Sequence, residues 1–132
     1  MKYIFTEMLK HIALTINDSE EIERFYIEIL QFAIKNKFTV NEKITRQVFN
    51  LNGCADVYLM VYEDIVFEVF ISSKRERKVF SHIALAYPDA EIIYNKAIQS
   101  GYKGLVRSNS DNCTFFIRDK SANMFEIKEL SR

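Results

Sequence analysis

Four side chains in this sequence are of the types that together hold a metal ion. The chain has only two histidines, and each opens the same tetrapeptide, His-Ile-Ala-Leu, at His11 and at His82. Two glutamates, Glu68 and Glu126, lie within apolar runs, each directly after a phenylalanine. A buried, unpaired carboxylate is energetically costly, so a positive partner is expected nearby. Two imidazoles and two carboxylates suit a divalent cation such as Zn, Ni, Fe, Mn or Co.

Each of these residues also has an ordinary structural explanation. A single histidine on a strand is commonly a hydrogen-bonded structural residue, and a single glutamate on a strand commonly points to solvent. That explanation would place Phe70 on the same wet face as Glu68, which is unfavourable for a phenylalanine. Because one His and one Glu recur in both halves of the chain, we favour the metal site.

The segments that follow the two histidines repeat the same order of structure. Both tetrapeptides alternate as strands, and His11 shares its face with the small residues Ala13 and Thr15. Small neighbours leave room for a substrate beside the ligands. Apolar residues then recur at helical spacing over 22–30 and again over 90–98, which predicts an amphipathic helix in each half.

Residues typical of helix ends support both predicted helices. Asp18 and Glu21 have the spacing of a capping box at the start of the first helix. Asp89 is expected to be the N-cap of the second helix, and Gly101 is expected to end it.

Strand-like runs complete each half. They lie at 42–51, 55–63 and 64–72 in the first half and at 101–107, 113–119 and 123–130 in the second. Glu63 and Asp64 have the polar character of a tight turn. The order β-α-β-β-β therefore occurs twice, which predicts an α+β fold of two βαβββ modules, about 8–72 and 79–130, joined by a linker at 72–80. Since one such module leaves a face of its sheet bare, we expect the two to pack as a single domain.

Composition narrows the class of protein. Eighteen basic and eighteen acidic residues give no net charge, which argues against nucleic-acid binding. Cys54 and Cys113 form no paired motif and are expected to be free thiols in a reducing compartment. No secretory signal and no apolar run of membrane-spanning length is found. We expect a soluble, cytoplasmic protein that does not bind membranes.

Three long segments resemble the vicinal oxygen chelate superfamily, which includes glyoxalase I, bleomycin-resistance proteins, fosfomycin-modifying enzymes and extradiol dioxygenases. The segments are "LKHIALTINDSEEIERFYIEILQF" (9–32), "FSHIALAYPDAEIIYNKAIQSGYK" (80–103) and "FFIRDKSANMFEIKEL" (115–130). The resemblance implies that the two modules form one cupped mixed β-sheet around a divalent metal. Carried over residue by residue, the implied ligands are His11, Glu68, His82 and Glu126, a set most similar to that of glyoxalase I.

The sequence departs from the family pattern at several positions. Gln31 stands where the family often has glycine, and the turn at 119–122 has neither its proline nor its glycine. Thr15 stands where glyoxalase I has an arginine that helps to hold glutathione. The ligand residues are unaffected, but these changes argue against glutathione as the substrate.

The resemblance implies a glyoxalase-like lyase or isomerase that acts on a small molecule with vicinal oxygens. The metal would stabilise an enediolate, and Glu68 or Glu126 would act as general base. The expected substrate pocket consists of Thr15, Tyr58, Met60, Phe70 and Phe115.

The sequence is also compatible with two other classes of function. A non-catalytic, resistance-type protein would bind a small molecule without chemistry, although such relatives often lack the ligand set. Dioxygenases and fosfomycin-type transferases use three ligands, so a fourth disfavours them. By resemblance we expect a homodimer, whose modules pair either within one chain or between two.

Overall fold

The computed structural model describes residues 9–74, 80–108 and 113–130, which form two compact units, one on each side of the segment 75–79. The predicted linker at 72–80 therefore lies partly outside the described residues. Cys54 and Cys113 are both free and exposed, as predicted. No helix in the described ranges has the length and apolar character needed to cross a bilayer.

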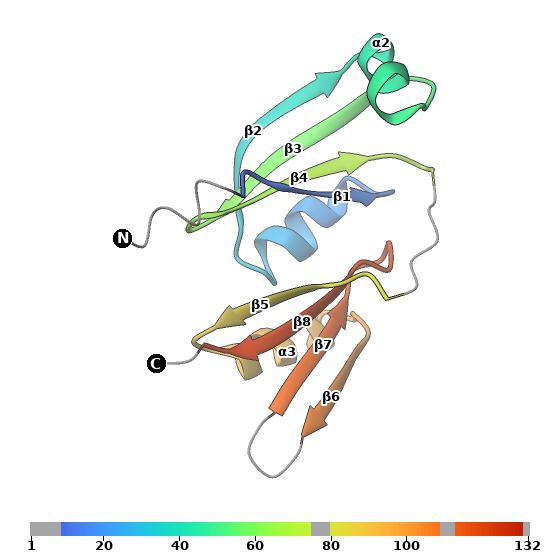
Figure 1. Cartoon of the computed structure of the whole chain (residues 1–132). Helices are drawn as coiled ribbons and strands as arrows, with labels where there is room; N and C mark the ends of the chain where they lie inside the picture. Colours follow the sequence, from blue (N-terminus) through green and yellow to red (C-terminus); the bar gives the residue numbers. More distant parts are fainter. Residues whose placement is uncertain (1–8, 75–79, 109–112, 131–132) are drawn as a thin grey trace. The chain divides into compact units, whose positions relative to one another are not determined.

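Each unit contains one four-stranded sheet, and the two sheets have the same topology (Figure 1). In spatial order, the first sheet comprises β1 (Ile12–Ile16), β4 (Ile65–Ile71), β3 (Ala55–Tyr62) and β2 (Ala33–Val40), and the second comprises β5 (Ile83–Tyr87), β8 (Met124–Glu129), β7 (Cys113–Arg118) and β6 (Gly104–Ser108). The first strand of each unit pairs in parallel with the last, and the other pairings are antiparallel. The predicted α+β fold of two βαβββ modules is confirmed.

One helix covers one face of each sheet, as the apolar stripes predict. The first is η1 (Ile22–Ile27), a π-type helix with Glu21 at its N-cap position, and in the turn before it Asp18 Oδ1 accepts the Glu20 N–H at 2.9 Å. The second is α3 (Ala90–Gln99), which ends where Gly101 adopts a φ of +92°. Asp89 is the N-cap of α3, as predicted, although its side chain forms no capping hydrogen bond.

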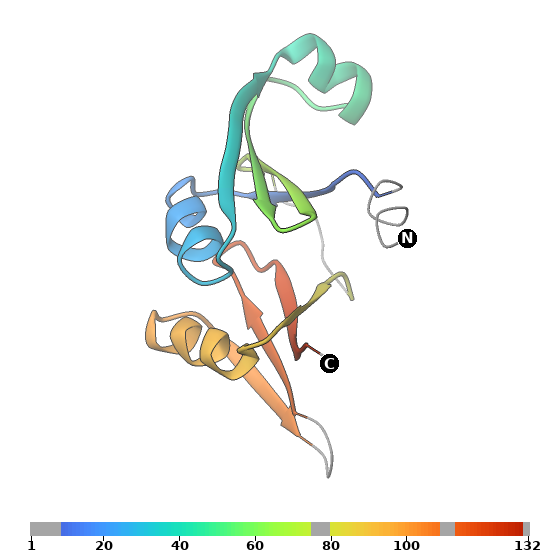
Figure 2. The same ribbon diagram turned by 90° about the vertical axis from the view of Figure 1, so that its left-hand side faces the viewer.

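The prediction of a strand at 42–51 is wrong. This segment forms two short helices, α2 (Glu42–Ile44) and η2 (Thr45–Phe49), which lie beyond the ends of β2 and β3 (Figure 2). Asn41 caps the first of them, since its Oδ1 accepts the Ile44 N–H at 3.0 Å. The strand that follows η1 is β2, an edge strand with a register shift between Ile34 and Asn36.

Alternation along the strands gives each sheet a helix face, which the helix covers, and an open face on the other side. In the first unit, buried Phe67 stacks on Phe32 at 4.5 Å between ring centroids and meets Tyr26 edge-on at 6.4 Å. Phe67 therefore belongs to the helix face. Its neighbours along β4, Glu68 and Val66, point to the open face.

The second unit has the same division. Phe125 and Ile127 of β8 are fully buried on the helix face, so Glu126 between them lies on the open face. Gly104 fixes the orientation of the edge strand β6. A Cβ atom there would lie 2.7 Å from Tyr94 Cε1 and 2.8 Å from Ile98 Cδ1, so this position faces α3.

The aromatic cluster around Phe67 predicts a large, local stability effect. Replacing Phe67 with Ala should lower the free energy of unfolding by about 3–5 kcal/mol, because it leaves a cavity between η1 and the sheet. The same change at Phe80, which is 90% exposed, is the matched control and should alter stability by less than about 0.5 kcal/mol. Urea unfolding followed by circular dichroism measures both, and equal losses would contradict this packing.

Candidate metal centre

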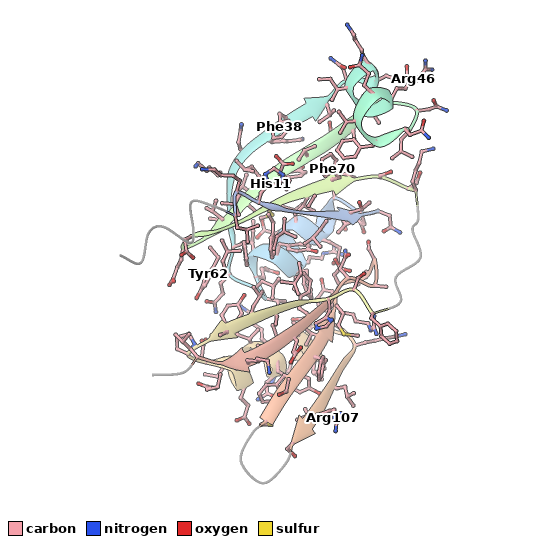
Figure 3. The ribbon with its side chains drawn as sticks, viewed as in Figure 1. His11, Phe38, Arg46, Tyr62, Phe70 and Arg107 are labelled. Carbon is pink, nitrogen blue, oxygen red and sulfur yellow. The ribbon has the colours of Figure 1, made fainter. Side chains whose placement is uncertain are left out.

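In the first unit, strand register brings His11 and Glu68 together on the open face. The parallel pairing of β1 with β4 sets Ala13 opposite Glu68. His11 precedes Ala13 by two residues and therefore points to the same face. Its Nε2 lies 3.3 Å from Glu68 Oε1. Figure 3 shows His11 and Phe70 on the side of this sheet away from η1, and Tyr62 on the other side.

In the second unit, the same register produces the same pair. The parallel pairing of β5 with β8 sets Ala84 opposite Glu126, and His82 precedes Ala84 by two residues. Its Nε2 lies 3.2 Å from Glu126 Oε1. The two units thus place one imidazole and one carboxylate with the same offset and nearly the same distance.

In both pairs the histidine is accessible from the open face, whereas the glutamate is partly shielded from water. The histidine side chains are 44% and 43% exposed, whereas the glutamate side chains are only 22% and 18% exposed. The alanines opposite the carboxylates leave space above them. A ligand could therefore approach the imidazole nitrogens, while the carboxylates lie in a partly dry environment that strengthens attraction to a cation.

The distances within the pairs fit two neighbouring ligands of one cation. Ligand atoms about 2.0–2.2 Å from a divalent ion, at angles between octahedral and tetrahedral, lie roughly 2.9–3.5 Å apart. The observed 3.3 and 3.2 Å fall within that range. They are longer than the usual N–H···O hydrogen bond of about 2.9–3.0 Å.

The other ring nitrogen of His82 indicates which nitrogen is free to bind a metal. His82 Nδ1 lies 2.9 Å from the backbone oxygen of Phe80. A carbonyl oxygen can only accept, so Nδ1 must carry the proton. In the neutral ring, Nε2 then holds a lone pair directed at the carboxylate of Glu126. Two acceptors at 3.2 Å repel each other unless a proton or a cation lies between them.

The two carboxylates differ in their second oxygen. Glu126 Oε2 lies 3.0 Å from Lys128 Nζ, so both of its oxygens have a partner. The position equivalent to Lys128 in the first unit is Phe70, two residues after Glu68. Glu68 therefore lies next to an aromatic ring instead of an ammonium group.

Neither pair is a complete metal site by itself. In the part of the chain that the structure describes, no cluster of three or more His, Cys, Asp or Glu side chains is found. One His–Glu pair offers at most two ligands, and two ligands leave most of the coordination sphere of a divalent cation open.

The five residues expected to form a substrate pocket do not share one face. Thr15 and Phe70 lie on the open face of the first sheet, and Phe70 contacts Phe49 of η2 edge-on at 5.5 Å between centroids. Tyr58 and Met60 lie on the helix face, where Met60 is fully buried.

Phe115 lies on the helix face of the second sheet, 5.0 Å from the ring of Tyr94 in α3. Of the five residues, only Thr15 and Phe70 lie on the same face as His11 and Glu68. Phe49 and Lys128 were missed by the sequence analysis. Lys128 could have been recognised because it follows Glu126 by two residues on the same face.

Comparisons with known proteins identify the fold. No protein-family model matches the sequence, and no curated protein matches it. Many solved structures do match. A glyoxalase family protein from Enterococcus faecalis has a TM-score of 0.68 and 18% identity, over 96% of this chain and 100% of that one.

Two further structures have comparable similarity. A mutant of the fosfomycin resistance protein FosX from Listeria monocytogenes, complexed with Mn(II) and 1S,2S-dihydroxypropylphosphonic acid, has a TM-score of 0.70 and 14% identity, over 93% and 92% of the two chains. The trypanothione-dependent glyoxalase I of Leishmania major has a TM-score of 0.70 and 15% identity, over 91% and 84%. The structural neighbours are members of the vicinal oxygen chelate superfamily, which confirms the fold expected from the sequence.

The contact between His82 and Phe80 predicts an unusual tautomer. In metal-free protein, at a pH where the ring is neutral, His82 should carry its proton on Nδ1, because Nδ1 donates to the carbonyl. Long-range ¹H–¹⁵N NMR of the imidazoles measures this directly, and the His11→Gln variant assigns the signals by leaving a single histidine. A neutral His82 with its proton on Nε2 would contradict the contact and reduce the pair with Glu126 to a simple hydrogen bond.

Proposed function

We propose that this chain, which has the fold of the vicinal oxygen chelate superfamily, is a metal-dependent, glyoxalase-like lyase or isomerase of a small molecule with vicinal oxygens. Its metal centre consists of His11, Glu68, His82 and Glu126. The observation that supports this most strongly is the recurrence of one His–Glu pair, with ligand-compatible spacing, at the same register in both units.

The imidazoles and the carboxylates have different roles in the proposed site. Each imidazole presents Nε2, and in His82 the Phe80 carbonyl holds the ring so that this nitrogen is the free one. The carboxylates balance the charge of the cation. When bound, a divalent cation such as Zn, Ni, Fe, Mn or Co supplies positive charge that stabilises negative charge developing on the oxygens of the substrate.

We assign the general base to Glu68. Among the described residues its carboxylate is paired only with His11, whereas Glu126 is held by both His82 and Lys128. A carboxylate held through one oxygen can move toward a substrate proton more easily than one held through two. Phe70 beside it provides an apolar wall that excludes water from the proton being transferred.

Both units must contribute to one centre, because each supplies two ligands. The pairs meet either within one chain or between the two chains of a homodimer. We place the enzyme in the cytoplasm, since free, exposed Cys54 and Cys113 suit a reducing compartment.

Metal content tests the shared centre. Purified protein loaded separately with Mn, Co, Ni and Zn should retain about one ion per chain after dialysis, as measured by elemental analysis. Changing His11 or His82 to Ala should weaken binding by more than the ~10–100-fold typical of an outer-shell change, because a direct ligand is lost. The control, Glu91→Gln on the exposed side of α3, should retain the ion. Two ions per chain, each removed by changes in only one unit, would contradict a shared centre.

Proton transfer tests the chemistry. Hemithioacetals and acyl-CoA epimers, screened in D₂O by NMR, should show metal-dependent exchange of the hydrogen next to the carbonyl. The Glu68→Gln variant should lower the rate for the best substrate by about 10²–10⁴-fold, and more than Glu126→Gln does, when both are compared at full metal occupancy. Metal-loaded protein that binds these compounds without exchange or turnover would instead indicate a sequestering protein.

A further inference from the structure

The second sheet has a cavity on its open face, and none of the proposed metal ligands lines it. It has a volume of about 290 Å³ and is lined by Lys103, Gly104, Leu105, Arg107, Phe116, Arg118 and Met124. This volume is just below the range typical of small-molecule sites, about 300–1,000 Å³, which suits a very small ligand. The cavity lies within one unit, so its composition does not depend on the other.

Strand register explains why these side chains share one face. Gly104 faces α3, so the residues that alternate with it along β6, Leu105 and Arg107, point to the open face. Leu105 pairs with Phe116, and Phe116 pairs with Glu126. Leu105, Phe116 and Glu126 therefore form one row across β6, β7 and β8, which connects the cavity to a proposed metal ligand.

The floor of the cavity is apolar. Leu105, Phe116 and Met124 provide it, and Leu105 is 58% exposed although it is a large aliphatic residue. Met124 precedes Glu126 by two residues on the same face of β8. An exposed apolar floor bordered by polar side chains is typical of a ligand site.

The walls of the cavity are cationic. Lys103, Arg107 and Arg118 surround the floor, and among the described residues none of the three is paired with a carboxylate. Figure 3 shows Arg107 on β6, toward the end of that strand. The whole chain has no net charge, so this local excess does not reflect a basic protein. Three like charges around a concave surface repel one another unless an anion lies between them.

We propose that this cavity binds an organic oxyanion, a carboxylate or a phosphonate or phosphate group, that carries a small apolar body. The arginines and the lysine hold the oxygens, and Leu105, Phe116 and Met124 contact the apolar part. With strands about 4.8 Å apart, β6 lies roughly 10 Å from Glu126 on β8. A small molecule anchored here therefore reaches the His82–Glu126 pair. The role of this cavity in catalysis rests on the proposed function, but the binding of an oxyanion in it does not.

Binding to metal-free, full-length protein tests the proposal. Three probes with the same phenyl group are compared: phenylphosphonate, benzoate and uncharged benzyl alcohol. Each is titrated into the protein in the presence of EDTA, and binding is followed by the ¹H–¹⁵N NMR signals. Phenylphosphonate or benzoate should bind at least tenfold more tightly than benzyl alcohol. The shifts should centre on residues 104–107 and Phe116, and affinity should fall as salt is raised. Tighter binding of phenylphosphonate assigns a dianionic group, and tighter binding of benzoate assigns a carboxylate.

Charge-matched variants separate the cavity from general electrostatics. Arg107→Gln and Arg118→Gln should each weaken binding by about tenfold or more, because each removes a charged hydrogen bond. Lys96→Gln, on the exposed side of α3, removes the same charge from the same unit and should leave the affinity unchanged. Equal effects of the three variants, or equal binding of benzyl alcohol, would overturn the proposal. Retained anion binding in protein that takes up no metal would refute the metal centre only.

Discussion

The parallel pairing of the first and last strands of each unit is the constraint on which the site depends. This pairing sets an alanine opposite the glutamate, and the histidine two residues earlier then points to the same face as the carboxylate. A shift of one residue would move either side chain to the face covered by the helix. The buried aromatic and aliphatic residues on either side of each glutamate hold the register, because they can be buried only on the helix side.

The two pairs share their geometry but differ in their surroundings. The second pair lies beside Lys128 and next to a cationic cavity, whereas the first lies beside Phe70 and the η2 segment that contacts it. The proposed metal ligands therefore recur in both units, while the residues around them differ. In the first unit, the carboxylate of Glu68 has a single partner among the described residues. In the second unit, the carboxylate of Glu126 has two partners and lies near a cationic cavity.

The repeated elements could be predicted from the sequence, but the details that depend on contacts between strands could not. Both histidine strands, both amphipathic helices and the strands carrying the glutamates were predicted by alternation and helical spacing. The strand β2 was missed because Lys35, Asn36 and Lys37 give an edge strand no apolar alternation. The segment 42–51 is rich in β-branched residues, and the cap at Asn41 that starts its helices was not recognised. Tyr58 and Met60, which we expected in the pocket, lie on the helix face, and this could not be predicted because the register of β3 against Glu68 is a property of the folded sheet.

X-ray absorption spectroscopy of the cobalt- or zinc-loaded protein can detect a metal centre shared by both His–Glu pairs. We expect a first shell of nitrogen and oxygen only, with the outer-shell scattering of two imidazoles, one from each unit. In the His11→Gln variant this signal should fall to one imidazole. A first shell with one imidazole or none in the unmodified protein, or one containing sulfur, would contradict a centre shared by the two His–Glu pairs.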